Sequence, residues 1–182
     1  NDIIKTPGTE SNVKEIYDAC NELKKDPNND IVNQFSEYYN YAIHRAVTGP
    51  SLEKSFLEVK KESNLKLRFY VSASGSSGTL AAGDYLKDSL GVLTAVVEAL
   101  ECPTLLKNGY GEHNIQGIGD KHVPLIHNVM NTDFVVGISD QATNNLNMLF
   151  NTEEGKKFLI SKKNLNIDFV NRLPEFGFST IA

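Results

Sequence analysis

The sequence predicts an α/β fold with three layers: a mainly parallel sheet with helices on both faces. Apolar residues alternate from Leu65 to Val71, as in a strand. Residues 80–86 then follow a helical pattern, and residues 92–98 are almost uninterruptedly apolar, as expected of a central parallel strand covered on both faces. Strand, helix and strand in this order make a βαβ unit, which is right-handed in nearly all sheets.

A first helix is expected near the start of the chain, with Ser11 as its N-cap. Its apolar positions recur at helical spacing: Val13, Ile16, Tyr17, Cys20 and Leu23. Proline and asparagines over residues 26–29 should end it. A loop rich in tyrosine and asparagine is expected next, and a second helix should begin at residues 48–51.

The second half alternates in the same way. A long loop over residues 101–120 precedes a short segment, a strand at 134–136 and a helix from about 140 to 150. The polar stretch 151–171 is expected to be helical and exposed. Residues 178–182 resemble a turn that starts another helix, and residues 2–5 resemble the end of a strand. We therefore expect a fragment of a longer protein.

Composition excludes several classes of function. The chain has 182 residues, 23% charged and 40% hydrophobic, with a net charge of -5. An acidic balance argues against nucleic acid and against anionic membrane surfaces. No apolar run reaches the roughly 20 residues of a membrane span, and the N-terminus lacks a signal-peptide pattern. Cys20 and Cys102 have no metal-ligand spacing, so free thiols in a reducing cytoplasm are expected.

A glycine-rich loop, Gly75-Ser76-Ser77-Gly78-Thr79, lies between the predicted strand and helix. Glycines let the backbone approach an anion closely, and the following helix would direct unpaired N–H groups and its positive dipole end at the same point. The loop lacks the Gly-Lys-Ser/Thr of a nucleotide P-loop and the G-x-G-x-x-G of dinucleotide sites. A phosphate cradle and an ordinary tight turn both remain open on this motif alone.

Further motifs occur in one order along the chain: Asn33-Gln34-Phe35, His44, Thr48-Gly49-Pro50, the glycine loop, Ile115-Gln116-Gly117-Ile118-Gly119 and Gly177-Phe178-Ser179. The series resembles the cysteine synthase and cystathionine β-synthase family of fold-type II pyridoxal-phosphate enzymes. The resemblance spans nearly the whole chain, and the I-Q-G-I-G pentapeptide is its most specific element. It implies pyridoxal 5'-phosphate as cofactor and β-replacement or β-elimination on an amino acid.

The resemblance also implies roles for single residues. Gly75, Ser76, Ser77, Gly78 and Thr79 match the family's G-T-G-G-T loop, which holds the cofactor phosphate. Ser179 matches the serine that faces the pyridine nitrogen, where a neutral hydroxyl suits β-chemistry. On the substrate side, the matching residues are Gln34, Gly117, Ile118 and Gly119. Asp120-Lys121-His122 departs from the small residues usual in the family, which puts the substrate in doubt.

Two family features are absent from the sequence: the segment with the Schiff-base lysine and the loop for the substrate carboxylate. No catalytic residue is therefore predicted in this chain, and the chain alone should be inactive. We expect residues 1–41 to belong to a smaller, mobile domain and residues 42–182 to a larger cofactor-binding domain. Because family members are commonly dimers, the resemblance also allows a homodimer.

One alternative function remains. The chain could be a non-catalytic regulatory module that binds a phosphate or nucleotide. His113, His122 and His127 lie close in sequence, but their spacing fits no common ligand pattern, so no metal site is predicted.

Overall fold

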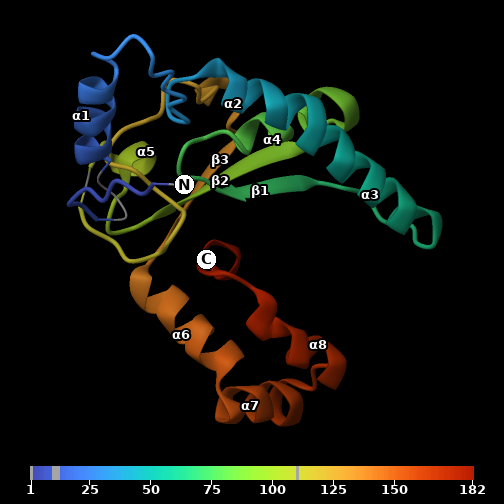
Figure 1. The fold of residues 1–182 in the computed structure, drawn as a ribbon. Helices are drawn as coiled ribbons and strands as arrows, with labels where there is room; N and C mark the ends of the chain where they lie inside the picture. Colours follow the sequence, from blue (N-terminus) through green and yellow to red (C-terminus); the bar gives the residue numbers. More distant parts are fainter. Residues whose placement is uncertain (1, 10–12, 110) are drawn as a thin grey trace.

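The fold is a parallel three-stranded sheet between two helical layers (Figure 1). The structure is a computed structural model, and it describes residues 2–9, 13–109 and 111–182. Strands β1 (Phe69–Ala73), β2 (Leu93–Ala99) and β3 (Phe134–Ile138) lie in the order β1-β2-β3. Ser72 is paired with Val96, and Val96 with Val135. The predicted parallel α/β architecture is thus confirmed, with the apolar run in the centre of the sheet.

Helix α4 (Leu80–Leu90) covers one face of the sheet and contacts β1 and β2. It begins directly after the glycine loop and ends at Gly91, whose φ of 67° is the left-handed conformation that ends helices. Ala81 and Ala82 are fully buried, and a side chain at Gly83 would meet Tyr70 and Thr94. Small residues on this face bring α4 close to the sheet, and its first turn therefore stands at the carboxyl end of β1.

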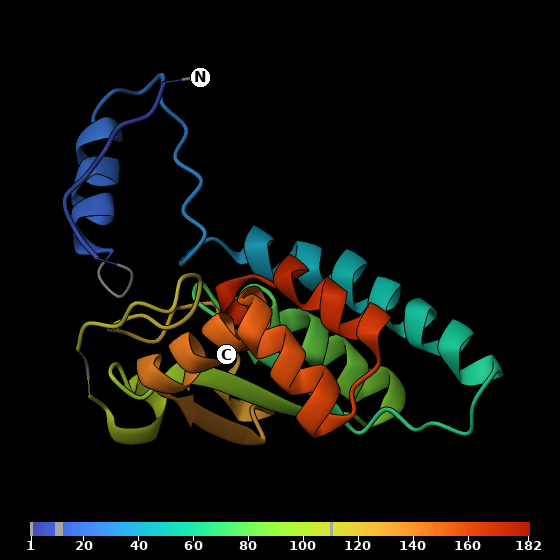
Figure 2. The same ribbon diagram turned by 90° about the horizontal axis from the view of Figure 1, so that it is seen from below.

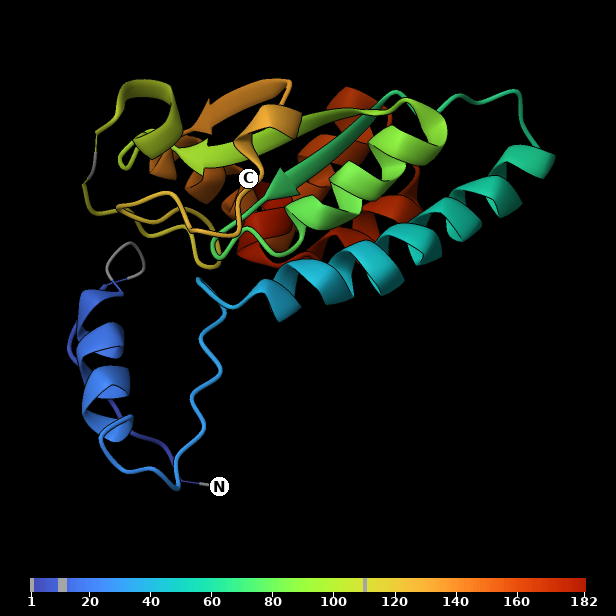
Figure 3. The same ribbon diagram turned by 90° about the horizontal axis from the view of Figure 1, so that it is seen from above.

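The first helix, α1 (Lys14–Leu23), agrees with the sequence prediction, whereas its expected cap, Ser11, lies outside the described residues. None of its residues is buried. Figure 3 shows α1 to one side of the sheet, next to the loops at one end of the molecule. It contacts them through Tyr17, whose hydroxyl lies 3.3 Å from Nε2 of His122.

The prediction of a tyrosine-rich loop before residue 48 is wrong, because most of this segment is helical. Helix α2 (Tyr38–Ile43), the π-helical turn η1 (His44–Thr48) and α3 (Gly49–Lys61) follow one another without a break. Pro50 lies in the first turn of α3, where its missing N–H would otherwise end the helical ladder, and a π turn absorbs such an irregularity. Helix α2 also runs across the expected domain boundary after residue 41.

Tyr41 fastens α2 to α4. Its hydroxyl donates to Oδ2 of the buried Asp84 across 2.7 Å. Burial, together with this carboxylate, raises the pKa of Tyr41 to about 12. Because Tyr41 stays protonated at neutral pH, its hydroxyl keeps donating to Asp84, and this hydrogen bond holds α2 against α4.

The second helical layer lies on the opposite face of the sheet (Figures 1 and 2). It contains α6 (Asp140–Asn151), α7 (Glu153–Lys163), α8 (Ile167–Arg172), the turn η3 (Leu173–Glu175) and α9 (Phe178–Ile181). Residues 151–171 are helical as predicted, although Leu159 and Val170 are buried against Leu173 rather than exposed. Phe69, Val71, Phe134 and Val136 keep about half of their surface exposed.

The connection from β2 to β3 contains α5 (Thr104–Lys107) and the turn η2 (Val129–Asn131). Its middle is anchored by Ile115 and Ile118, which pack with Ala99 and Cys102 in a fully buried cluster. Phe178 and Ala182 pack against the same cluster. These apolar anchors bring the I-Q-G-I-G segment, the end of β2 and α9 to one place.

Candidate functional site

A cavity of about 420 Å³ opens at the carboxyl end of β1. Open α/β sheets bind ligands at this edge, and the volume is in the range of small-molecule sites. Eight of the ten residues assigned from the sequence line it: Gln34, Gly75, Ser76, Thr79, Gly117, Ile118, Gly119 and Ser179. The remaining lining residues are Val13, Phe35, Ala73, Ser74 and Asp120. Residues up to 166 positions apart in sequence therefore share one cavity.

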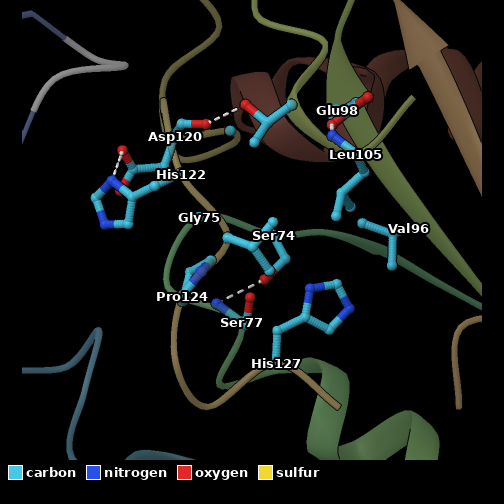
Figure 4. A pocket seen from close by; sticks show the side chains of 13 residues that line it. Ser74, Gly75, Ser77, Val96, Glu98, Leu105, Asp120, His122, Pro124 and His127 are labelled. Carbon is cyan, nitrogen blue, oxygen red and sulfur yellow. Dashed lines mark hydrogen bonds and ion pairs between the residues drawn. The ribbon is translucent and has the colours of Figure 1, made fainter. Parts of the chain in front are cut away.

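The glycine loop presents free backbone donors at the start of α4. Among the residues that the structure describes, the N–H groups of Ser76, Gly78 and Thr79 have no hydrogen-bond partner. The N–H of Ser77 donates to Oγ of Ser74 across 3.0 Å (Figure 4). Unpaired N–H groups beside the positive end of an 11-residue helix favour an anion. This part of the cavity is suited to a phosphate.

Ser77 and Gly78 are the two assigned residues that do not line the cavity. Ser77 has a φ of 69° and is 3% exposed, so a non-glycine residue occupies a left-handed, buried position. Its side chain lines a smaller, adjacent pocket. A Cβ at Gly78 would lie 2.2 Å from Oδ1 of Asn40, so a side chain there would have to displace this amide.

Asn40 was missed by the sequence prediction, which placed it in a loop. From α2, its Nδ2 donates to Oγ of Ser76 at 3.1 Å and to the backbone oxygen of Gln34 at 2.7 Å. One amide therefore connects the glycine loop with the segment that carries Gln34. No pattern in the sequence marks this residue, because its partners lie 36 and 6 positions away.

The I-Q-G-I-G segment lies directly against the glycine loop. The N–H of Gly119 donates to the backbone oxygen of Ser74 across 3.0 Å. A Cβ at Gly75 would lie 3.4 Å from the backbone oxygen of Gly117. Gly117 and Gly119 have φ values of 86° and 70°, in the region that glycine adopts without strain. The glycines of both segments permit this close approach of two backbones.

Ser179 closes the cavity from the other side. It lies in α9, and its Cβ is 3.8 Å from the position that a Cβ at Gly117 would occupy. The cavity thus has free N–H donors at one wall and a neutral hydroxyl at another. A flat ring with a phosphate on one side and a nitrogen on the other matches this arrangement of polar groups.

Buried carboxylates stand behind the cavity and organise its loops. Oε2 and Oε1 of Glu98 accept the N–H groups of Leu105 and Leu106 at 2.9 and 2.8 Å, which caps α5 (Figure 4). The hydroxyl of Thr104 donates to the backbone oxygen of Asp120 across 2.6 Å. Glu98 therefore has a structural role that its place in an apolar run did not reveal.

Asp120 and His122 form a second polar feature. Nδ1 of His122 lies 3.3 Å from Oδ1 of Asp120, whose side chain is 2% exposed. Burial raises the pKa of the Asp120 carboxyl, while the nearby imidazoles of His122 and His113 lower it in part. In Figure 4 the pair points away from His127, whose ring lies at the opposite end of the smaller pocket. Burial lowers the pKa of His127.

No lysine is among the described residues that line the cavity. Lys121, next to Asp120, extends its Nζ to Oε1 of Glu112 at 2.7 Å. Within the described residues, no three histidine, cysteine, aspartate or glutamate side chains gather as metal ligands. Cys20 and Cys102 are free, and no described helix is long and apolar enough to cross a bilayer.

Comparison with known sequences identifies relatives. No family model matches the chain. It is 34% identical over 132 residues to cysteine synthase B of Campylobacter jejuni, covering 71% of this chain and 42% of that protein. It is 25% identical over 156 residues to a cysteine synthase of Staphylococcus aureus, covering 85% of this chain and 48% of that one. The chain therefore spans less than half the length of these curated relatives.

Solved structures with the same fold agree. A hydrogen sulfide-producing enzyme from Fusobacterium nucleatum superposes with a TM-score of 0.69 at 23% identity, over 92% of this chain and 44% of that one. An O-acetylserine dependent cystathionine beta-synthase from Helicobacter pylori has a TM-score of 0.60 at 20% identity, over 91% and 52%. The chain is a homologue of the cysteine synthases, and it has the fold of the fold-type II pyridoxal-phosphate enzymes.

Proposed function

We propose that this chain, as a cysteine synthase homologue, forms the phosphate-binding side of a pyridoxal-phosphate enzyme that catalyses β-replacement or β-elimination on an amino acid. The single observation that supports it most is the cavity itself. Free N–H donors of the glycine loop, the hydroxyl of Ser179 and the glycines of the I-Q-G-I-G segment all line or border one space.

The residues present fit this cofactor. The N–H groups of Ser76, Gly78 and Thr79, with the hydroxyl of Ser76, would hold the phosphate. The hydroxyl of Ser179 would face the ring nitrogen and leave it unprotonated. When bound, the cofactor supplies an electron sink for the carbanion that forms at the α carbon of the amino acid. Gln34, Gly117, Ile118 and Gly119 would line the space for that amino acid.

The chain's own residues act by positioning. Asn40 holds Ser76 and the Gln34 segment together, and Gly117 and Gly119 leave room for a flat ring beside the glycine loop. A lysine for the covalent link to the cofactor is not among the described residues lining the cavity. The lysine that abstracts the α-proton would therefore come from elsewhere in the protein. Both cysteines are free, which supports action in the cytoplasm.

A first experiment locates binding on this chain. Amide ¹H–¹⁵N spectra are recorded while pyridoxal phosphate, pyridoxal or inorganic phosphate is added. We expect phosphate to shift the amides of residues 75–79, and pyridoxal phosphate to shift these and Ser179 as well. Such spectra detect even millimolar binding. Shifts elsewhere, or none, would contradict the proposal.

A second experiment separates the enzyme from a non-catalytic phosphate-binding module, which the absence of a lysine from the described lining keeps as the second candidate. The complete gene product is incubated with pyridoxal phosphate and reduced with borohydride. A cofactor adduct on one lysine, found by peptide mass analysis, supports the enzyme. Phosphate-dependent shifts without any adduct would favour the module.

A further inference from the structure

Asp120 lies at the border between the cofactor cavity and the smaller pocket behind it, and it lines both. It follows the I-Q-G-I-G segment directly, so the two left-handed glycines before it determine where its side chain goes. The side chain is 2% exposed. A carboxylate is therefore held inside the site, near the substrate-side residues Ile118 and Gly119.

This carboxylate is less well hydrogen-bonded than buried carboxylates normally are. Within the described part of the chain, neither oxygen accepts a hydrogen bond of normal geometry, although the backbone N–H groups of Lys121 and His122 lie near enough to lower its pKa. Glu98 provides the contrast, because both of its oxygens accept backbone N–H groups. Both oxygens of Asp120 are buried, and they are thus left with unused acceptor capacity at the wall of the cavity.

The neighbours of Asp120 are suited to passing a proton. Nδ1 of His122 lies 3.3 Å from Oδ1, and the hydroxyl of Tyr17 lies 3.3 Å from Nε2 of the same ring. His113 is 6% exposed, and neither of its ring nitrogens has a partner among the described residues. A Cβ at Gly119 would lie 2.9 Å from its Nε2, so this ring packs directly against the residue before Asp120. One carboxylate therefore lines the cavity, one imidazole lines the smaller pocket behind it, and a second imidazole packs against Gly119.

We propose that Asp120, assisted by His122, is a catalytic base for the second substrate and selects a nucleophile that still carries its proton, such as a thiol. This inference rests on the proposed function. The proton of the S–H group moves to Oδ2 of Asp120, and sulfur keeps the electron pair with which it bonds to the β carbon of the amino acid. In the net replacement, the bond between that carbon and its original substituent breaks, and this leaving group departs with the electron pair. The carboxylic acid then returns its proton to water through His122.

The need for such a base depends on the nucleophile. A thiol with a pKa near 8.5 is mostly protonated at neutral pH, so its attack gains from a proton acceptor within reach. The hydrogensulfide anion has already lost that proton. Sulfide therefore does not need a base such as Asp120 with His122, whereas a thiol does.

The test uses the complete gene product loaded with pyridoxal phosphate. Its absorbance band is read first in the wild type and in Asp120→Asn, to show that the variant retains an intact site. Rates are then measured with 2-mercaptoethanol and with sulfide. We expect Asp120→Asn to lower the ratio of the thiol rate to the sulfide rate about 10²-fold, the contribution usual for general base catalysis. Glu112→Gln, an exposed carboxylate on the same loop, is the matched control and should leave the ratio unchanged.

A second readout needs no cofactor. Carbon NMR of the aspartate carboxyls in this chain should show Asp120 titrating above its ordinary value, and His122→Gln should move that titration further up, because the imidazole that lowers it is gone. An unchanged rate ratio in Asp120→Asn, or an equal loss with both nucleophiles, would overturn the role of Asp120. A wild type without a cofactor band would instead count against the proposed function.

Discussion

The side chain of Asn40 occupies the space that a Cβ at Gly78 would need: the two would be 2.2 Å apart. At the same time, Nδ2 of Asn40 donates to Ser76 Oγ across 3.1 Å. A helix that the sequence did not predict thus carries the amide that supports the glycine loop. The shape of this loop depends on a glycine and an asparagine that are 38 positions apart.

We predict that Gly78→Ala destabilises the chain by about 2 kcal/mol, since an added methyl group must displace a packed side chain. Urea unfolding measures the change. Gly177→Ala is the matched control, because a Cβ there meets nothing within 4 Å, and it should alter the free energy of unfolding by only a few tenths of a kcal/mol.

Asn40→Ala should cost about 1–2 kcal/mol, because it removes two hydrogen bonds. In the double variant with Gly78→Ala, the added methyl group no longer meets the amide. The summed losses should therefore exceed the loss of the double variant by about 1 kcal/mol. Strict additivity in unfolding experiments would show that the two residues do not interact as described.

Ser77→Gly should stabilise the chain by about 0.5–1 kcal/mol. A left-handed conformation costs a non-glycine residue about 1–2 kcal/mol. Glycine also loses more conformational entropy on folding, which reduces the stabilisation gained by removing this strain. Asn164→Gly serves for comparison, since Asn164 has a φ of 53° at the end of α7 but asparagine tolerates this region well. If thermal unfolding shows the larger gain for Asn164→Gly, strain at Ser77 is not the reason.

Stability should fall as the pH is lowered below about 6.5, in part through His127. Burial depresses the pKa of its imidazole in the folded state, so the unfolded chain binds the proton more readily. Its contribution is therefore complete above the unfolded pKa and is lost as the pH falls through the folded pKa. His127→Gln, which retains a hydrogen-bonding side chain toward Thr132, should flatten this part of the curve. Unfolding free energies from pH 5 to pH 8 provide the measurement, and equal slopes would argue against His127.

Amide hydrogen exchange should be much faster in α1 than in α4. No residue of α1 is buried, whereas six residues of α4 are. Helices with few buried contacts open locally at low cost. Exchange followed by mass spectrometry would test the expected mobility of residues 1–41. Equal protection of both helices would remove the support for a separate mobile domain.

The sequence by itself predicted the parallel α/β fold and the helix that follows the glycine loop, because both depend on local patterns. Alternation marks β1, continuous apolar character marks the central β2, and a glycine ends α4 at residue 91. The order of the glycine-containing motifs likewise indicated the cysteine synthase relationship. The order of the motifs runs along the chain, whereas each of the other signals lies within a few consecutive residues.

Only the tertiary structure decided how these segments meet. It turned the tyrosine-rich segment into a helix continuous with α3, because packing of Tyr41 against Asp84 outweighs weak local preferences. It also gave Asn40 its partners, left both oxygens of the buried Asp120 carboxylate without a hydrogen bond of normal geometry and made Glu98 the cap of α5. Such contacts join residues distant in sequence, and their energies depend on burial and on geometry that no local pattern encodes.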